Sequence, residues 1–180
     1  MKSIILLLVS LYCTLHDISA IEKIDTLDLS IEITDSTYKA RYKNVIDDLT
    51  LFVSQTSIYR GEITNAWHNG IYEKKYNGKN VKDFNEALSK YFEDRRATSD
   101  YWRYLSQQEI IKSEIKSLNK YPKDLEIAFN EMLDLGIMID EFFNAVIDPD
   151  GSYNSYTAYT RDLEQKIRRK LYELEMRYTD

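Results

Sequence analysis

Apolar residues recur at spacings of three and four along most of the chain, a pattern typical of amphipathic helices. The first apolar stripe follows a group of helix-capping residues at 35–37, and it predicts a helix that ends near Gly61. Residues 63–76 predict a shorter second helix before a turn at Asn77-Gly78. The members of the first stripe are Tyr38, Tyr42, Val45, Leu49, Phe52, Thr56 and Tyr59.

A second long stripe extends from Val81 to Leu118. Thr98 and Ser99 are weaker helix formers, so residues 97–100 predict a break or a kink in it. Pro122 occupies the position of a first helical turn, and acidic residues follow it, as the positive end of a helix dipole favours. The stripe contains Val81, Phe84, Leu88, Tyr91, Tyr101, Leu105, Ile111, Ile115 and Leu118.

The helix predicted from Pro122 to Ile147 is apolar around much of its circumference, which is typical of the buried centre of a bundle. The Asp148–Gly151 segment has the composition of a turn, and a last stripe predicts a helix from there to Tyr178. Long amphipathic helices with short connections predict an all-α domain over residues 35–180, an antiparallel bundle of about four helices.

The residues before this domain divide into two parts. Residues 1–20 begin with Lys2, continue with an uncharged apolar run and end in the small residue Ala20, which is the pattern of a secretory signal peptide. An uncleaved anchor and a buried first helix are the alternatives. Residues 21–34 fit both strand and helix periodicity, so we interpret them as a short N-terminal arm.

Cleavage after Ala20 would change the chemical inventory. It would remove Cys13, the sole cysteine, and leave His68 as the sole histidine, so core packing rather than disulfides must hold the domain together. No second apolar run is long enough to span a bilayer, and we expect no transmembrane anchor after cleavage. We expect an extracellular protein, or a periplasmic one if the source is bacterial. The formal net charge of −6 argues against nucleic-acid binding.

Few residues support catalysis or a cofactor. One histidine and no cysteine give no zinc set, and no Glu-x-x-His pair suggests a di-iron bundle. The Asp148-x-Asp150 pair resembles the opening of a calcium loop, but the glycine and glutamate of such a loop are missing. Nucleophile and nucleotide motifs are missing too, so we expect no cofactor and no bound metal. Carboxylate pairs, Glu131 with Asp134 or Asp140 with Glu141, keep a hydrolase as a third possibility.

A basic run on the last helix has two interpretations. Lys166, Arg168, Arg169 and Lys170 could dock an acidic partner or a lipid headgroup. They could equally form a solvated face near a helix C-terminus, where cations are favourable, and we prefer this second interpretation.

Aromatic residues form the candidate binding surface. The chain has 15 tyrosines, and two groups of aromatic residues stand out from the core stripes. The first group crowds neighbouring helical positions and cannot all face one side, and the second follows the Gly151 turn, interleaved with serine and asparagine. Exposed tyrosine interleaved with serine and asparagine is common in binding surfaces. The alternative is that these rings cap the end of the bundle with their hydroxyls in water. The two groups are Tyr101, Trp102 and Tyr104, and Tyr153, Tyr156 and Tyr159.

These observations predict a secreted, non-enzymatic helical protein that binds another protein through an exposed aromatic surface. The first alternative is an extracellular carrier that holds an apolar small molecule or lipid between its helices. A carrier predicts an enclosed apolar cavity, whereas a binding module predicts a filled core with an exposed patch. The partner and the oligomeric state do not follow from the sequence.

Overall fold

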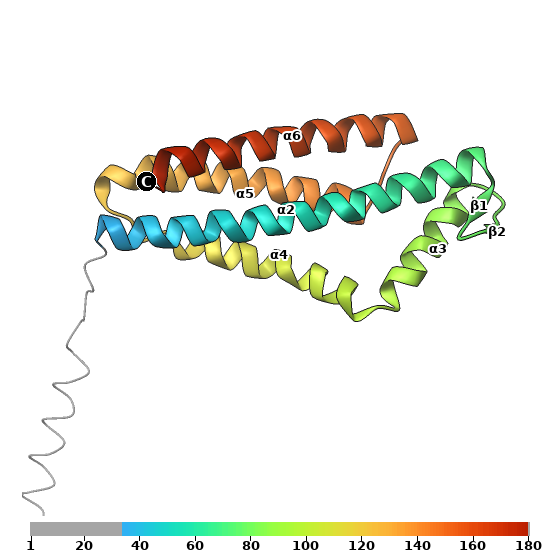
Figure 1. Ribbon diagram of the computed structural model, residues 1–180, viewed down its shortest axis with the longest axis horizontal. Coiled ribbons are helices and arrows are strands. Elements are labelled where there is room, and N and C mark those ends of the chain that lie inside the picture. The colour runs from blue at the N-terminus through green and yellow to red at the C-terminus, as the bar shows by residue number, and fades with distance from the viewer. Residues whose placement is uncertain (1–33, 180) are drawn as a thin grey trace, which may run out of the picture. The chain divides into compact units, whose positions relative to one another are not determined.

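The computed structural model describes residues 34–179, and this part of the chain is all-α (Figure 1). The predicted signal peptide and residues 21–33 of the predicted arm lie outside the described residues. The elements are the α-helices α2 (Asp35–Tyr72), α3 (Phe84–Arg96), α4 (Ser99–Ser117), α5 (Glu126–Ile147) and α6 (Tyr153–Tyr178), the 3-10 helix η1 (Lys123–Leu125), and the strands β1 (Lys75–Tyr76) and β2 (Lys79–Asn80).

Helix α2 is one continuous helix of 38 residues, which corrects the prediction of a first helix that ends near Gly61. Thr34 caps its start, because the Thr34 hydroxyl accepts a hydrogen bond from the Thr37 backbone N–H at 3.3 Å. Gly61 lies in the helix interior, between the buried residues Tyr59 and Ile63. A single glycine costs a helix about 1 kcal/mol, and burial on both sides of Gly61 outweighs that cost.

Helix α2 is also the helix on which the others pack. It contacts α3, α4, α5 and α6, and α5 further contacts α4 and α6. Figure 1 shows α2, α4, α5 and α6 side by side along their length, and α3 with the hairpin near the C-terminal end of α2. The predicted central helix, α5, buries residues such as Met132 and Phe142 but leaves Leu133 and Ile137 exposed. The centre of the fold is therefore α2 rather than α5.

Local signals place the breaks between helices correctly. The predicted break at 97–100 separates α3 from α4, and the Thr98 hydroxyl caps α4 by accepting from the Tyr101 N–H at 3.4 Å. Pro122 directly precedes η1, which leads into α5. After the Asp148–Gly151 turn, Ser152 and Ser155 form a reciprocal capping box that starts α6.

The predicted turn at Asn77-Gly78 connects two strands, although the sequence predicted a helix up to it. Asn77 and Gly78 have positive φ angles of 46° and 74°, as a tight hairpin requires. Strand β1 pairs antiparallel with β2, with Tyr76 opposite Lys79. Across residues 34–179, no helix combines the length and the apolar character that a bilayer crossing requires.

Candidate functional site

The first predicted aromatic group divides between the core and the surface. Tyr104 is fully buried, and its ring stacks on Tyr59 with centroids 4.3 Å apart. Its hydroxyl donates a hydrogen bond to Thr56 Oγ1 at 3.2 Å. Tyr101 is buried as well, because it lies three positions before Tyr104 on the same helix face. Trp102 points away, with 56% of its surface exposed.

The second predicted group attaches α6 to α2. Tyr156 is buried with its ring centroid 5.4 Å from that of Trp67, and Tyr153 lies 6.4 Å from the same indole. Burial raises the pKa of Tyr156 well above its ordinary value, so the ring stays neutral. Tyr159 is exposed, and its hydroxyl donates to the Glu141 carboxylate. Trp67 lies within the predicted helix 63–76, but nothing in the local sequence indicates that it anchors this contact.

The prediction that these six residues form an exposed surface is therefore wrong for three of them. Tyr101, Tyr104 and Tyr156 belong to the core, because neighbouring helices cover the faces on which they lie. Trp102 and Tyr159 are exposed on different helices, and Tyr153 is half-buried. The aromatic residues mainly fill the space between helices.

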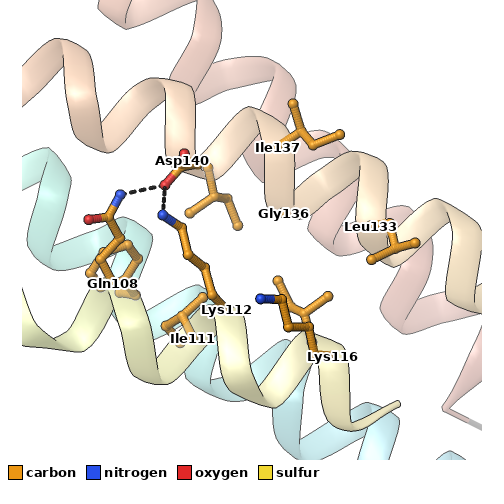
Figure 2. Close-up of a pocket in the computed structure, with 11 residues that line it drawn as sticks. Gln108, Ile111, Lys112, Lys116, Leu133, Gly136, Ile137 and Asp140 are labelled. Carbon is orange, nitrogen blue, oxygen red and sulfur yellow. Dashed lines mark hydrogen bonds and ion pairs between the residues drawn. The ribbon is translucent and has the colours of Figure 1, made fainter. Parts of the chain in front are cut away.

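A hollow between α4 and α5 combines buried and exposed aliphatic side chains, and we call it the α4–α5 groove (Figure 2). Its volume is about 260 Å³. Figure 2 shows Asp140 of α5 facing Gln108 and Lys112 of α4 at one end of the groove. Buried residues form its base, and two α5 residues form its edge, Leu133 at 36% and Ile137 at 67% exposure. The base consists of Phe52, Ile111, Ile115 and Ile139.

Gly136 lets the Ile115 side chain approach α5 closely at this groove. A Cβ atom at Gly136 would lie 2.8 Å from Cδ1 of Ile115, so any side chain would occupy the space in which α4 and α5 meet. The sequence showed this glycine inside an apolar pattern, but it could not show which residue of another helix lies opposite.

The polar edge of the groove contains one fixed lysine and one available lysine. Asp140 accepts hydrogen bonds from Gln108 and from Lys112, the latter at 2.9 Å. Burial opposes ionisation of Asp140, but these hydrogen bonds outweigh it and lower the pKa of this carboxyl. The side chain of Lys116 has no hydrogen-bond or ion-pair partner among residues 34–179. The groove therefore presents an uncompensated positive charge beside apolar surface.

Three of the four candidate catalytic carboxylates, Glu131, Asp140 and Glu141, have structural partners. Glu131 accepts from Lys170 at 2.8 Å, Arg177 at 2.9 Å and Tyr178 at 2.7 Å. Burial would raise its pKa, but the hydrogen bonds from Lys170 and Tyr178 lower it overall. A carboxyl with a lowered pKa is poorly suited to donate a proton at neutral pH.

The basic run on α6 is largely paired within the protein. Three of its four cations contact acidic side chains, which agrees with the interpretation of a solvated helix face. The pairs are Lys166 with Asp162, Arg168 with Glu164 and Lys170 with Glu131. His68 is exposed near the end of α2, beside the Tyr72 ring at 4.6 Å.

Comparison of the chain with protein-family models, curated proteins and solved structures gives no significant match. A function can therefore be argued only from the geometry of the chain itself.

Proposed function

We propose that this chain is a secreted, non-enzymatic binding protein whose α4–α5 groove receives an amphipathic helix of a partner protein. In this proposal α2, α4, α5 and α6 form an antiparallel four-helix bundle that serves as a rigid scaffold. Export rests on the signal-peptide pattern of residues 1–20. The main support for the proposed binding site is the exposure of Leu133 and Ile137 above an apolar base.

Exposed aliphatic side chains beside an apolar hollow favour a docking site. Leu133 and Ile137 lie four positions apart on α5, so they form one ridge along the groove. Full burial of a wholly exposed side chain of this kind contributes about 1.5–3 kcal/mol, and a partner would gain the share that corresponds to the surface still exposed here. An amphipathic helix that lies along a groove typically inserts apolar anchors at helical spacing. The ridge and the groove together fit that mode of recognition.

Charge selects the kind of helix that would fit. Lys116 contributes a free ammonium group at the groove, and Lys120 and Lys123, both exposed, follow it in the chain. An acidic residue beside the apolar face of the partner helix would pair with Lys116. We therefore propose a partner helix with an acidic flank.

The groove fits a protein helix better than a carried lipid. A carrier typically encloses most of the surface of its ligand. Ile137, at the edge of this groove, is 67% exposed, so the groove is open to solvent along α5. A lipid bound there would remain largely in water, whereas a protein helix would cover the groove with its own polar face outward.

Site-specific cross-linking tests this proposal. A photo-crosslinking amino acid replaces Ile137 in the full chain, and the protein is irradiated in the fluid into which its natural source secretes it. A matched variant carries the same group at Ile127, which is on the same helix, equally exposed at 67%, and outside the groove. We expect a protein adduct at position 137, located within an acidic amphipathic helix, and none at position 127. Equal adducts at both positions, no adduct, or a lipid adduct alone would overturn the proposal.

A charge substitution gives an independent measurement once the partner is recovered. Ile137→Glu places a negative charge where the proposed partner helix is acidic and apolar. We expect its affinity for that partner to fall about tenfold or more, the loss that about 1.4 kcal/mol produces. Ile127→Glu should leave the affinity unchanged, since that side chain lies outside the groove.

A further inference from the structure

A second hollow, formed by α2, α3 and the β1–β2 hairpin, has the opposite chemistry to the groove. Its volume is about 390 Å³, within the range common for small-molecule sites. Glu62, Asn65 and Asn69 of α2 line it together with Tyr76 and Asn77 of the hairpin, and Asp94 and Arg95 of α3 complete it. We call it the polar hollow.

Hydrogen bonds and ion pairs hold one wall of the polar hollow in place. Arg95 forms an ion pair with Glu62, and the Tyr91 hydroxyl donates to the same carboxylate at 3.0 Å. The Arg95 guanidinium also lies over the rings of Tyr59 and Tyr91, at 5.6 and 5.5 Å from their centroids. The one cation that lines this hollow in the described structure is therefore already neutralised, which disfavours an anionic ligand.

The hairpin wall is fixed through Asp94. The Tyr76 hydroxyl and the Asn77 side-chain amide both donate to Oδ2 of Asp94, at 2.9 and 3.2 Å. Burial first, and then this hydrogen bond, raise the pKa of Tyr76 to about 12, so its hydroxyl remains a donor at neutral pH. Because both bonds end on Oδ2, the other carboxylate oxygen of Asp94 keeps its capacity to accept.

Two amides add further capacity. The Asn65 side chain makes no hydrogen bond within the described part of the chain, and Asn69 makes one long contact, 3.4 Å, through its oxygen to His68. Each asparagine side chain offers two N–H donors and a carbonyl oxygen that accepts. Together with the open oxygen of Asp94, they present donors and acceptors side by side in a preformed hollow.

We propose that the polar hollow binds a neutral ligand with several adjacent hydroxyl groups, such as a saccharide unit. Each hydroxyl both donates and accepts, so neighbouring hydroxyls would donate to Asp94 and accept from Asn65 and Asn69. The half-buried ring of Tyr76 offers an apolar surface for the C–H groups of the same ligand. This site is separate from the α4–α5 groove and does not depend on the function proposed for that groove.

Titration of the full chain with neutral saccharides tests the proposal. Glucose, galactose, N-acetylglucosamine and maltose are added at millimolar concentrations while backbone amide shifts are followed by NMR. We expect at least one of them to shift amides of the hairpin and α3. Methylammonium and inorganic phosphate are the charged probes. No response to any saccharide, or a stronger response to either charged probe, would overturn the proposal.

Three variants locate the site. Asn65→Ala removes a side chain without a structural partner, and Asp94→Asn keeps an acceptor for Tyr76 while replacing the open oxygen with a donor. We expect each to weaken saccharide binding about tenfold, with the thermal unfolding temperature of Asn65→Ala unchanged. Asn130→Ala, at an exposed asparagine of α5, is the matched control and should bind like the original chain. Binding that survives both Asn65→Ala and Asp94→Asn would show that the hollow is not the site.

Discussion

Gly70 of α2 and Ala87 of α3 lie so close that a Cβ atom on Gly70 would be 2.7 Å from the Cβ of Ala87. The same atom would be 2.7 Å from the Cα of Phe84, a backbone atom that cannot turn aside. Gly61 lies on the same helix, and a Cβ atom there would meet nothing within 4 Å. The two glycines of α2 therefore have different consequences for stability.

Alanine substitutions at these glycines should act in opposite directions. Gly70→Ala forces α3 away from α2, and overpacking of this kind costs about 1–3 kcal/mol. Gly61→Ala should stabilise α2 by about 0.5–1 kcal/mol, because glycine is a poor residue for a helix interior. Urea denaturation of both variants measures the free energies of unfolding. A Gly70→Ala variant as stable as Gly61→Ala would contradict the close packing of α2 and α3.

The aromatic residues of α4 should differ strongly in their effect on stability. Tyr104→Ala removes a fully buried ring and should cost about 3–5 kcal/mol. Tyr104→Phe keeps the ring but loses the hydrogen bond to Thr56, so it should cost about 1 kcal/mol. Trp102→Ala, at an exposed position, should change the free energy of unfolding by less than about 1 kcal/mol.

Chemical denaturation of the three α4 variants under one set of conditions gives this ranking directly. If Trp102→Ala were as destabilising as Tyr104→Ala, burial would not explain how much Tyr104 contributes to the free energy of unfolding. The ranking also matters for binding studies. A loss of binding in a variant of Tyr104 would reflect a damaged core rather than a lost contact with a partner.

Acid should weaken the contact between α5 and α6 through Glu131. Its folded pKa lies below the usual value of 4.5, so the ionised carboxylate stabilises the fold above that pH and loses this contribution as pH falls through the folded pKa. Lys170, Arg177 and Tyr178 of α6 face this carboxylate, and Tyr42 of α2 lies nearby. Glu131→Gln should therefore be less stable at neutral pH and should decline less between about pH 5 and pH 3.

Unfolding curves recorded at several pH values test the contribution of Glu131. Asp134→Asn, at an exposed aspartate in the middle of the same helix, is the control and should retain the pH dependence of the original chain. The pKa values of Asp140 and Glu164 are lowered as well. These two carboxylates should therefore make every variant lose some stability in acid. An identical pH dependence in Glu131→Gln and the original chain would argue against the proposed electrostatic role.

The sequence predicted those features that depend on a few neighbouring residues. Thr98 marked a break because its hydroxyl caps the next helix, and Asn77-Gly78 marked a turn because both residues tolerate positive φ. The continuity of α2 through Gly61 was not predictable in this way, since the burial of Tyr59 and Ile63 comes from other helices. Local composition cannot report such contacts.

The candidate sites were harder to predict for the same reason. The three-residue spacing of Tyr101 and Tyr104 indicated a shared helix face, but only the packing of α2 and α5 decides that this face is buried. The α4–α5 groove depends on Gly136 facing Ile115, and the two residues lie on different helices. Charged and apolar residues far apart in the sequence become a site only when the fold brings them together.

The β1–β2 hairpin should respond to the conformation of a single residue. Gly78 has a φ angle of 74°, a conformation that costs a residue with a side chain about 1–2 kcal/mol. Gly78→Ala should therefore loosen the hairpin, and Tyr76 and Asn77 would lose their fixed positions at Asp94. The helices should stay folded, because the hairpin residues 77–80 are exposed and outside the core.

Amide hydrogen exchange measures this local loosening. The Val81 N–H donates to the Lys74 carbonyl at 2.9 Å and closes the base of the hairpin. Its exchange should accelerate in Gly78→Ala, whereas buried amides of α2 and α5 should exchange as in the original chain. Lys79→Ala, one position further along and compatible with a strand, is the control and should leave the exchange of Val81 nearly unchanged. Equal protection of Val81 in both variants would mean that the positive φ of Gly78 does not hold the hairpin together.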